Sequence, residues 1–184
     1  MFMKNTFAFI LFLIFTINPI YGQEINWVSI EEAKELIKKE PRKIIMDLYT
    51  NWCGPCKLLD KNTFGNPDVA EYINNNFYAI KFNAEGKSTV IFDDSTFTNP
   101  NYDPAKANRR NAQHEFARYL GVRAYPTIAF FDSDLSFIAP VSGYLKPKQI
   151  EIYLKLFHSD AYKDINNAEK WENYQKEFKN EFEG

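Results

Sequence analysis

The feature that most constrains this chain is a pair of cysteines, Cys53 and Cys56, that directly follows an apolar segment. They are the only 2 cysteines among 184 residues. The apolar segment, residues 43–49, predicts a buried strand that leads into a helix beginning near Cys53. A thiolate at the positive end of a helix is stabilised, so we expect Cys53 to be a nucleophile near neutral pH. Cys56 follows one helical turn later, close enough to attack a mixed disulfide formed on Cys53.

The same spacing has two other interpretations. Zinc sites also use Cys-x-x-Cys, but they need two more ligands, and the chain has no third cysteine. Its two histidines, His114 and His158, lie far from each other in the sequence. A purely structural disulfide would close a very short loop and restrain little of the unfolded chain. Redox chemistry is therefore the favoured interpretation, with a metal site and an inert bridge as alternatives.

The residues around the cysteines support the redox interpretation. Pro55 would fall in the first helical turn, where its missing N–H costs nothing. Gly54 has no side chain, so the backbone of a substrate could approach it closely. Trp52 offers a flat apolar surface beside Cys53, either as a substrate contact or as a partly buried aromatic side chain. These three residues are candidate substrate-binding positions.

The complete string Trp-Cys-Gly-Pro-Cys-Lys resembles that of the thioredoxin family, and the resemblance extends over residues 24–157. It implies an α/β thioredoxin fold, with a central mixed β-sheet flanked by helices. It also implies an exported bacterial thiol–disulfide oxidoreductase that reduces disulfides in client proteins. The redox-active pair Cys53–Cys56 would then serve in place of a cofactor. Two alternatives remain: a disulfide oxidase or isomerase, and a non-catalytic secreted module that binds peptides.

Two further candidate catalytic residues are Asp47 and Lys81. Asp47 lies within the otherwise apolar strand, where burial raises the pKa of a carboxyl group and suits it to proton exchange. A side chain turned to solvent at a sheet edge is the alternative for Asp47. The resemblance implies that Asp47 exchanges a proton with Cys56 and that Lys81, on the next strand, pairs with Asp47. A lysine in a strand more often lies on a solvated face, so a surface position for Lys81 is the alternative.

Tyr125 and Pro126 precede the apolar segment 127–131. A proline is not accommodated in the middle of a paired strand, so Pro126 marks a strand start or a special peptide bond. The resemblance implies a cis Tyr125–Pro126 bond that faces the cysteines, with the backbone of Tyr125 pairing with a client segment. The family's cytosolic members carry a small aliphatic residue where this chain has Tyr125, which leaves substrate preference open.

Residues 1–22 are typical of a signal peptide, with Lys4 followed by an apolar stretch too short to span a bilayer comfortably. We therefore expect an exported protein, periplasmic in a double-membrane bacterium, with no stable membrane insertion after cleavage. An uncleaved anchor is the alternative. By family analogy, the expected partners are client proteins with disulfides and a membrane-embedded thiol donor of electrons.

Charge and composition narrow the function further. The net charge is −2 and the sequence contains no basic stripe or motif, so we expect no nucleic-acid partner. With 17 Phe and 11 Tyr, the core is expected to be rich in aromatic side chains. No bound metal is expected, and the protein is expected to be a monomer.

The remaining pattern alternates strands with helices. Strands are predicted at residues 27–28, 43–49, 78–83, 127–131 and 137–141, and helices from Ser29 to Pro41, from Cys53, and at 69–76, 111–120 and 147–157. Two segments exceed a minimal thioredoxin. Residues 86–110 are expected to form an inserted surface loop, with partner recognition as the alternative. Residues 158–184 are expected to form amphipathic helices that pack back on the domain, with a dimer contact as the alternative.

Overall fold

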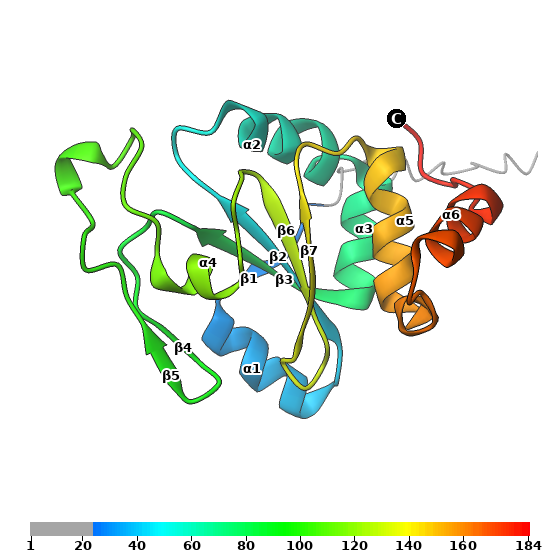
Figure 1. The fold of residues 1–184 in the computed structure, drawn as a ribbon, viewed down its shortest axis with the longest axis horizontal. Helices are drawn as coiled ribbons and strands as arrows, with labels where there is room; N and C mark the ends of the chain where they lie inside the picture. Colours follow the sequence, from blue (N-terminus) through cyan, green and yellow to red (C-terminus); the bar gives the residue numbers. More distant parts are fainter. Residues whose placement is uncertain (1–23) are drawn as a thin grey trace, which may run out of the picture.

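The computed structural model describes residues 24–184, and its centre is a five-stranded mixed sheet (Figure 1). The strand order is β1-β3-β2-β6-β7. The strands are β1 (Trp27–Val28), β2 (Lys43–Tyr49), β3 (Phe77–Asn83), β6 (Thr127–Phe131) and β7 (Phe137–Ser142). β3 pairs parallel with both β1 and β2, while β6 pairs antiparallel with β2 and with β7. The predicted signal peptide, residues 1–22, lies outside the described residues.

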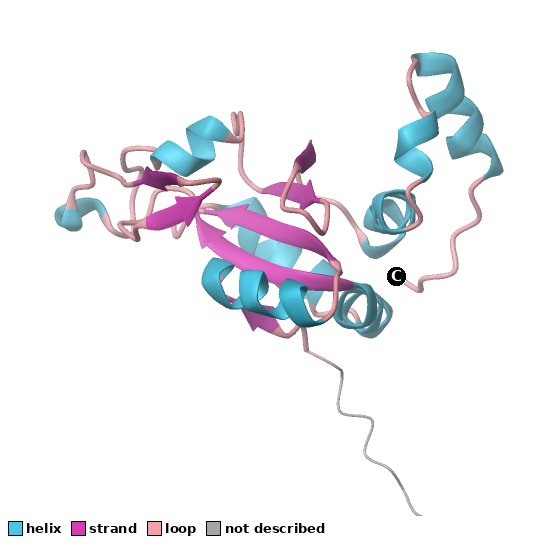
Figure 2. Cartoon of the chain, turned by 90° about the horizontal axis from the view of Figure 1, so that it is seen from below, coloured by secondary structure: helices cyan, strands magenta, loops and turns pink. Residues whose placement is uncertain are grey.

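Helices cover both faces of the sheet, giving the α/β sandwich that the sequence predicts (Figures 1 and 2). The helices α1 (Ile30–Lys39) and α4 (Glu115–Tyr119) pack on one face, and α3 (Pro67–Asn76) and α5 (Pro147–His158) pack on the other. Side chains along a strand alternate between the two faces. Ile45 therefore joins the α3/α5 core, whereas Ile44 and Met46 join the α1/α4 core. Within residues 24–184, no helix is both long and apolar enough to cross a membrane.

Helix starts follow capping residues that the sequence contains. The Ser29 hydroxyl accepts the Glu32 N–H at 3.0 Å and begins α1. Asn66 caps α3 by accepting the Val69 N–H at 3.2 Å, so α3 begins at Pro67, two residues before the predicted start. These caps satisfy backbone donors that have no partner inside the helix.

The predicted helix 111–120 is shorter in the structure, where α4 covers only Glu115–Tyr119. The His114 ring accepts the Phe116 N–H at 3.1 Å, and this cap sets the helix start. Asn111 is held outside the helix because its side chain bonds with the backbone of Asp103 and its N–H donates to Glu85. Three polar contacts therefore replace the helical turn that the periodicity predicts.

The inserted segment contains a hairpin made of β4 (Val90–Phe92) and β5 (Ser95–Phe97). Val90 and Phe92 are buried in the α1/α4 core, so the expectation of a surface loop is wrong for this part of the insertion. Ile91, between them, faces solvent because neighbouring strand residues point to opposite sides. Residues 98–113 follow without a regular strand and lead into α4.

The C-terminal extension packs back on α5, as predicted, through α6 (Ala168–Glu177) and the tail after it (Figure 1). Trp171 stacks on Tyr153 of α5, with ring centroids 5.7 Å apart. Phe182 is buried beside Tyr72 of α3. The fully buried Glu151 carboxylate accepts the backbone N–H groups of Glu181 and Phe182 at 2.8 and 3.1 Å. The tail is thus fixed by both apolar and polar contacts.

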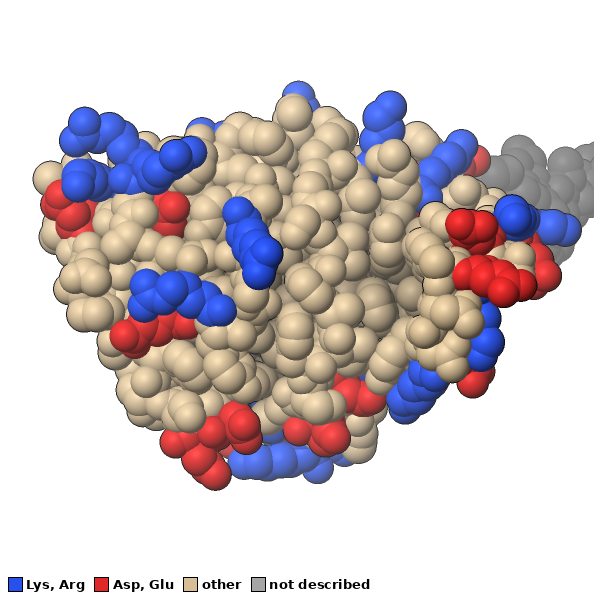
Figure 3. Space-filling model, viewed as in Figure 1, with Lys and Arg blue, Asp and Glu red and all other residues tan. Residues whose placement is uncertain are grey.

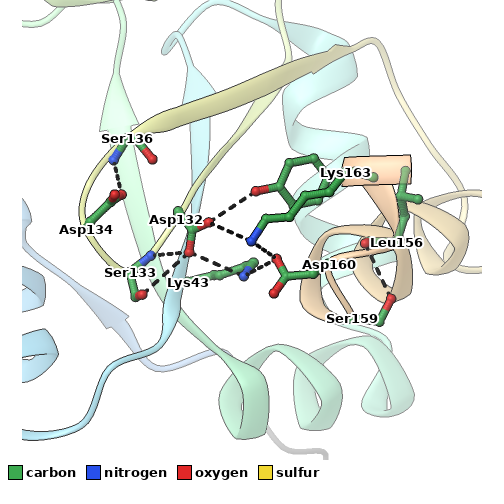
Figure 4. A network of polar contacts seen from close by, with 10 residues as sticks. Lys43, Asp132, Ser133, Asp134, Ser136, Leu156, Ser159, Asp160 and Lys163 are labelled. Atoms are coloured by element: carbon green, nitrogen blue, oxygen red, sulfur yellow. Dashed lines mark hydrogen bonds and ion pairs between the residues drawn. The ribbon is translucent and has the colours of Figure 1, made fainter. Parts of the chain in front are cut away.

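A polar network fastens the start of the extension to the sheet (Figure 4). Lys43, at the start of β2, contacts Asp132 at 3.3 Å and Asp160 at 2.9 Å. The Tyr162 hydroxyl donates to Asp132 at 3.1 Å, and Lys163 contacts Asp160 at 3.0 Å. The network therefore joins β2, the β6–β7 turn and the segment after α5.

Candidate active site

The two cysteines lie where β2 leads into α2 (Gly54–Leu59) and are joined as a disulfide. Their Cα atoms are 5.3 Å apart, and the Cys53 sulfur accepts the Cys56 N–H at 3.1 Å. Cys53 is the N-cap of α2, so its sulfur occupies the position where a helix favours negative charge. Both sulfurs are nearly covered, with Cys53 2% exposed, which limits attack to partners that dock. This is the placement expected for a nucleophile and a resolving thiol.

Gly54 and Pro55 form the exposed first turn of α2. A Cβ atom added at Gly54 would meet no atom within 4 Å, so packing inside the chain does not require a glycine there. The open space beside Gly54 is available to the backbone of another molecule. Pro55 occupies the helical position where a missing N–H has no consequence.

Asp47 is 1% exposed on β2, and neither of its carboxylate oxygens has a hydrogen-bond partner within residues 24–184. Burial raises its pKa from an ordinary 3.8 to about 7. The ammonium group of Lys81, 3.7 Å away, opposes this rise, and the Asp60 carboxylate adds to it. Asp47 can therefore take up or release a proton near neutral pH, as proton exchange with a thiol requires.

Lys81 lies on β3 directly opposite Asp47 in the parallel pairing, which favours the predicted pair over a solvated lysine. Its ammonium group also contacts the Asp60 carboxylate and lies over the rings of Trp27 and Tyr49, 5.2 Å from each centroid. An open pocket of about 460 Å³, lined in part by Asp60 and Lys81, brings solvent to this ion pair. Lys81 thus contacts the buried Asp47 carboxylate and also lines a pocket that is open to solvent.

Asp60 is a site residue that the sequence reasoning missed. It directly follows α2 and begins the π-helical turn Asp60–Phe64. Its spacing of four residues from Cys56 was an available signal, because such residues share one face of a helix.

The Tyr125–Pro126 peptide bond is cis, as the resemblance implies. The Pro126 carbonyl accepts the Gly143 N–H at 2.8 Å, which fixes the bond at the start of β6. The Tyr125 ring meets Trp52 edge to face, with centroids 6.1 Å apart. Burial, followed by the nearby Glu85 carboxylate, raises the pKa of Tyr125 to about 12. Trp52 and Tyr125 therefore form one aromatic wall beside Cys53.

Glu85 and Arg110 complete this wall, and the sequence reasoning missed both. The buried Glu85 carboxylate accepts the Trp52 indole N–H at 2.6 Å and the Asn111 N–H at 2.8 Å. The guanidinium carbon of Arg110 lies 4.8 Å from the centroid of the Trp52 ring. No sequence spacing relates Glu85 or Arg110 to Trp52, because the three residues come from separate loops.

The structure brings the predicted residues together in two groups. Trp52, next to Cys53 in the chain, contacts Tyr125, which precedes the buried Pro126, and Asp47 and Lys81 pair within the sheet. Among residues 24–184, no cluster of three or more His, Cys, Asp or Glu side chains could hold a metal ion.

Comparisons with known proteins agree with the fold and with the cysteine pair described above. A family model described as a thioredoxin-like domain matches residues 30–158. The thiol:disulfide interchange protein DsbD of Pectobacterium atrosepticum is 28% identical over 131 residues, which cover 70% of this chain and 19% of that protein. DsbD of Escherichia coli K12 is 26% identical over 112 residues, covering 59% of this chain and 16% of that protein. The chain thus spans less than a fifth of the length of these curated relatives.

Solved structures agree in fold. A thioredoxin-fold protein from Helicobacter pylori matches with a TM-score of 0.56 at 16% identity, covering 79% of this chain and 94% of that one. A thioredoxin from Thermus thermophilus matches with a TM-score of 0.55 at 12% identity, covering 79% and 98%. The family match spans four of the five strands of the sheet, the cysteine pair and the cis-proline loop, and the chain therefore belongs to the thioredoxin-like domain family.

Proposed function

We propose that this protein is an exported thiol–disulfide oxidoreductase that reduces disulfides in client proteins through Cys53 and Cys56. The observation that carries the proposal is the cysteine pair at the start of α2, combined with the buried Asp47 carboxylate on β2, which has no hydrogen-bond partner within residues 24–184. Neither a structural disulfide nor a peptide-binding module requires a buried acid that titrates near neutral pH. The similarity to DsbD proteins, named as thiol:disulfide interchange proteins, supports the same chemistry.

The reaction begins from the dithiol form. The Cys53 thiolate attacks one sulfur of a client disulfide, forming a Cys53–client mixed disulfide and releasing the first client thiolate. Cys56 then loses its proton, with Asp47 as the acceptor, and attacks the Cys53 sulfur. This step breaks the mixed disulfide, releases the second client thiolate and closes the Cys53–Cys56 bond. Two electrons pass from the protein dithiol to the client, and the released client thiolates take up protons.

A second dithiol must reduce the Cys53–Cys56 bond before the next cycle. We propose a membrane-embedded thiol donor for this step and a periplasmic location for the protein. The signal-like residues 1–22 support the exported location, and the similarity to a thiol:disulfide interchange protein supports exchange with a second dithiol.

The reducing direction rests on the residues that surround the Cys53 thiolate. A more stabilised thiolate makes a cysteine pair more oxidising. The spacer is Gly54-Pro55, with no histidine to add positive charge beside the thiolate. We expect a reduction potential more negative than about −200 mV, near thioredoxin at about −270 mV rather than DsbA at about −120 mV.

The direction is tested by equilibrating residues 24–184 with mixtures of reduced and oxidised dithiothreitol or glutathione. Free thiols are then alkylated, and the two forms are separated by mass. A potential near about −120 mV would contradict the reductase assignment and favour an oxidase. Reduction of insulin by catalytic amounts of the protein, with dithiothreitol as electron source, tests the activity itself.

A further inference from the structure

The second half of the inserted segment, residues 104–113, lies against the loop that carries Trp52 and Cys53. The Asn51 side chain donates to the Ala107 carbonyl at 2.8 Å. On the far side of Arg109 and Arg110, the Asn111 N–H donates to the same Glu85 oxygen that accepts the Trp52 indole N–H. Both flanks of Arg110 are therefore tied to the active-site end of the sheet, so its position beside Trp52 is set by the fold.

The Arg110 guanidinium lies on the face of Trp52 and is exposed. It makes no ion pair or hydrogen bond with any other residue in the described part of the chain, 24–184. Stacking on an indole leaves the donors at the edge of a guanidinium free, in the fork arrangement that fits a carboxylate. Arg110 thus presents an unused anion-binding edge on the aromatic wall that adjoins Cys53.

The exposed charged side chains around Arg110 are predominantly basic. In the three segments that form this end of the molecule, residues 50–58, 104–113 and 121–126, all exposed charged side chains are basic: Lys57, Lys106, Arg109, Arg110 and Arg123. In Figure 3, basic side chains predominate along the upper edge, where Figure 1 places α2. The nearby acids are already engaged, since Asp103 contacts Lys106 at 3.4 Å and Glu85 is buried.

We propose that Arg110 is a specificity-determining residue that receives a carboxylate from the client, so that the protein prefers disulfides flanked by Asp or Glu. This inference rests on the proposed function and adds the substrate class. An extended client segment that docks beside Tyr125 and Pro126 passes the Trp52–Arg110 wall. An acidic residue near its reactive cysteine then forms a charge-assisted pair with Arg110, in a field that the neighbouring basic residues reinforce.

Two peptides test the preference. Each contains one intramolecular disulfide, and they differ only in whether two Glu or two Gln flank one cysteine. The pre-reduced protein is mixed with each peptide at low ionic strength, and the second-order rate constant of reduction is measured by chromatography. We expect the Glu peptide to be reduced about two- to fivefold faster, the range for one partly exposed charge pair. The advantage should shrink in 0.5 M salt, at a Debye length of about 4 Å.

Three variants sharpen the test. Arg110→Gln should bring the Glu-to-Gln rate ratio close to one, and Arg110→Lys should keep part of it because charge remains while the planar fork is lost. Arg118→Gln is the matched control, since Arg118 is an exposed arginine of α4 that pairs with Glu115, and it should keep the full ratio. Equal rates for both peptides, or a ratio unchanged in Arg110→Gln, would overturn the inference alone. Reduction of neither peptide would overturn the proposed function and the inference with it.

Discussion

Two buried carboxylates in this molecule, Asp47 and Glu151, have opposite environments. Asp47, in the central strand, has no hydrogen-bond partner in the described chain, and its pKa rises to about 7. Glu151, in α5, accepts bonds from Asn180, Glu181 and Phe182 and contacts Lys155 at 2.8 Å. Burial raises the pKa of Glu151, but these partners outweigh it and hold the pKa below its ordinary value.

The difference separates a chemical role from a structural one. A buried acid without hydrogen-bond partners destabilises the fold in its charged form, and such groups are typical of sites where proton transfer uses them. A buried acid with several donors organises the segment that supplies them. Asp132, though only partly buried, resembles the second kind, because it contacts Lys43 and accepts hydrogen bonds from Tyr162 and the Ser133 N–H (Figure 4). Substitutions at the active-site end should therefore alter turnover, whereas those around α5 should alter stability and leave turnover unchanged.

The largest expected effect is at the cysteines. Cys56→Ser should accumulate client proteins as mixed disulfides on Cys53, because no thiol remains to resolve them. Cys53→Ser should accumulate none and should abolish insulin reduction. Non-reducing gels followed by mass spectrometry give the measurement, with Asp132→Asn as a control that keeps full activity per folded molecule. Equal trapping by both cysteine variants would contradict the assigned roles.

Asp47→Asn should stabilise the oxidised protein while slowing turnover. The folded-state pKa of Asp47 lies above its unfolded value of 3.8, so the folded protein binds the proton more tightly. Stability is then fully present below about pH 4 and falls as the pH rises through about 7. The shift corresponds to about 4 kcal/mol, which Asp47→Asn should recover at pH 8.

Urea unfolding of both proteins at pH 5 and pH 8 measures this difference. If the free energy of unfolding of Asp47→Asn changes with pH as much as that of the parent, Asp47 is not the source of the pH dependence. The pH dependence of client reduction should also change, because the carboxyl group titrates together with the thiols. An unchanged pH–rate profile would exclude Asp47 from proton transfer.

Glu151→Gln should do the reverse, lowering the free energy of unfolding by about 2 kcal/mol at pH 7 while leaving client reduction intact. The folded-state pKa of Glu151 is depressed, so its contribution is present above about pH 4.5 and is lost as the pH falls further. Amide hydrogen exchange should show faster opening of residues 180–184 in the variant. If Glu151→Gln lost activity as well as stability, the contrast between a structural role for Glu151 and a chemical role for Asp47 would be wrong.

The smallest effects are expected in the network of Figure 4. Lys43 is largely buried and contacts two carboxylates, whereas Lys163 is more than half exposed. Lys43→Met should cost about 1–2 kcal/mol, and Lys163→Met less than about 0.5 kcal/mol. Thermal unfolding of the two variants checks the order. Equal losses would show that exposure does not set the strength of these pairs.

Local patterns in the sequence predict much of the fold because they reflect local physics. The apolar run 43–49 and the cysteines beyond it identify the central strand and the start of α2. The cis proline and the Asp47–Lys81 pair follow from a resemblance whose motifs are specific. In each case, neighbouring residues or a family pattern carry the information.

The missed features depend on contacts between distant segments. Glu85, Arg110 and Trp52 meet only because the insertion folds back on the active-site loop, and no periodicity encodes that contact. The helical periodicity before α4 extends back to residue 111, but hydrogen bonds with Glu85 and Asp103 hold Asn111 outside the helix. Tertiary hydrogen bonds override local propensity at such positions.

The three tryptophans of this chain occupy three different environments. Trp52 lies at the nucleophile, Trp27 lies beneath the ammonium group of Lys81 and beside Phe64, and Trp171 stacks between Tyr153 and Tyr174 in the C-terminal extension. Indole emission depends on the local environment. In variants that keep a single tryptophan, fluorescence would therefore report on one region at a time. Trp52 would report on the redox state, Trp27 on the Asp47–Lys81 ion pair, and Trp171 on detachment of the C-terminal extension.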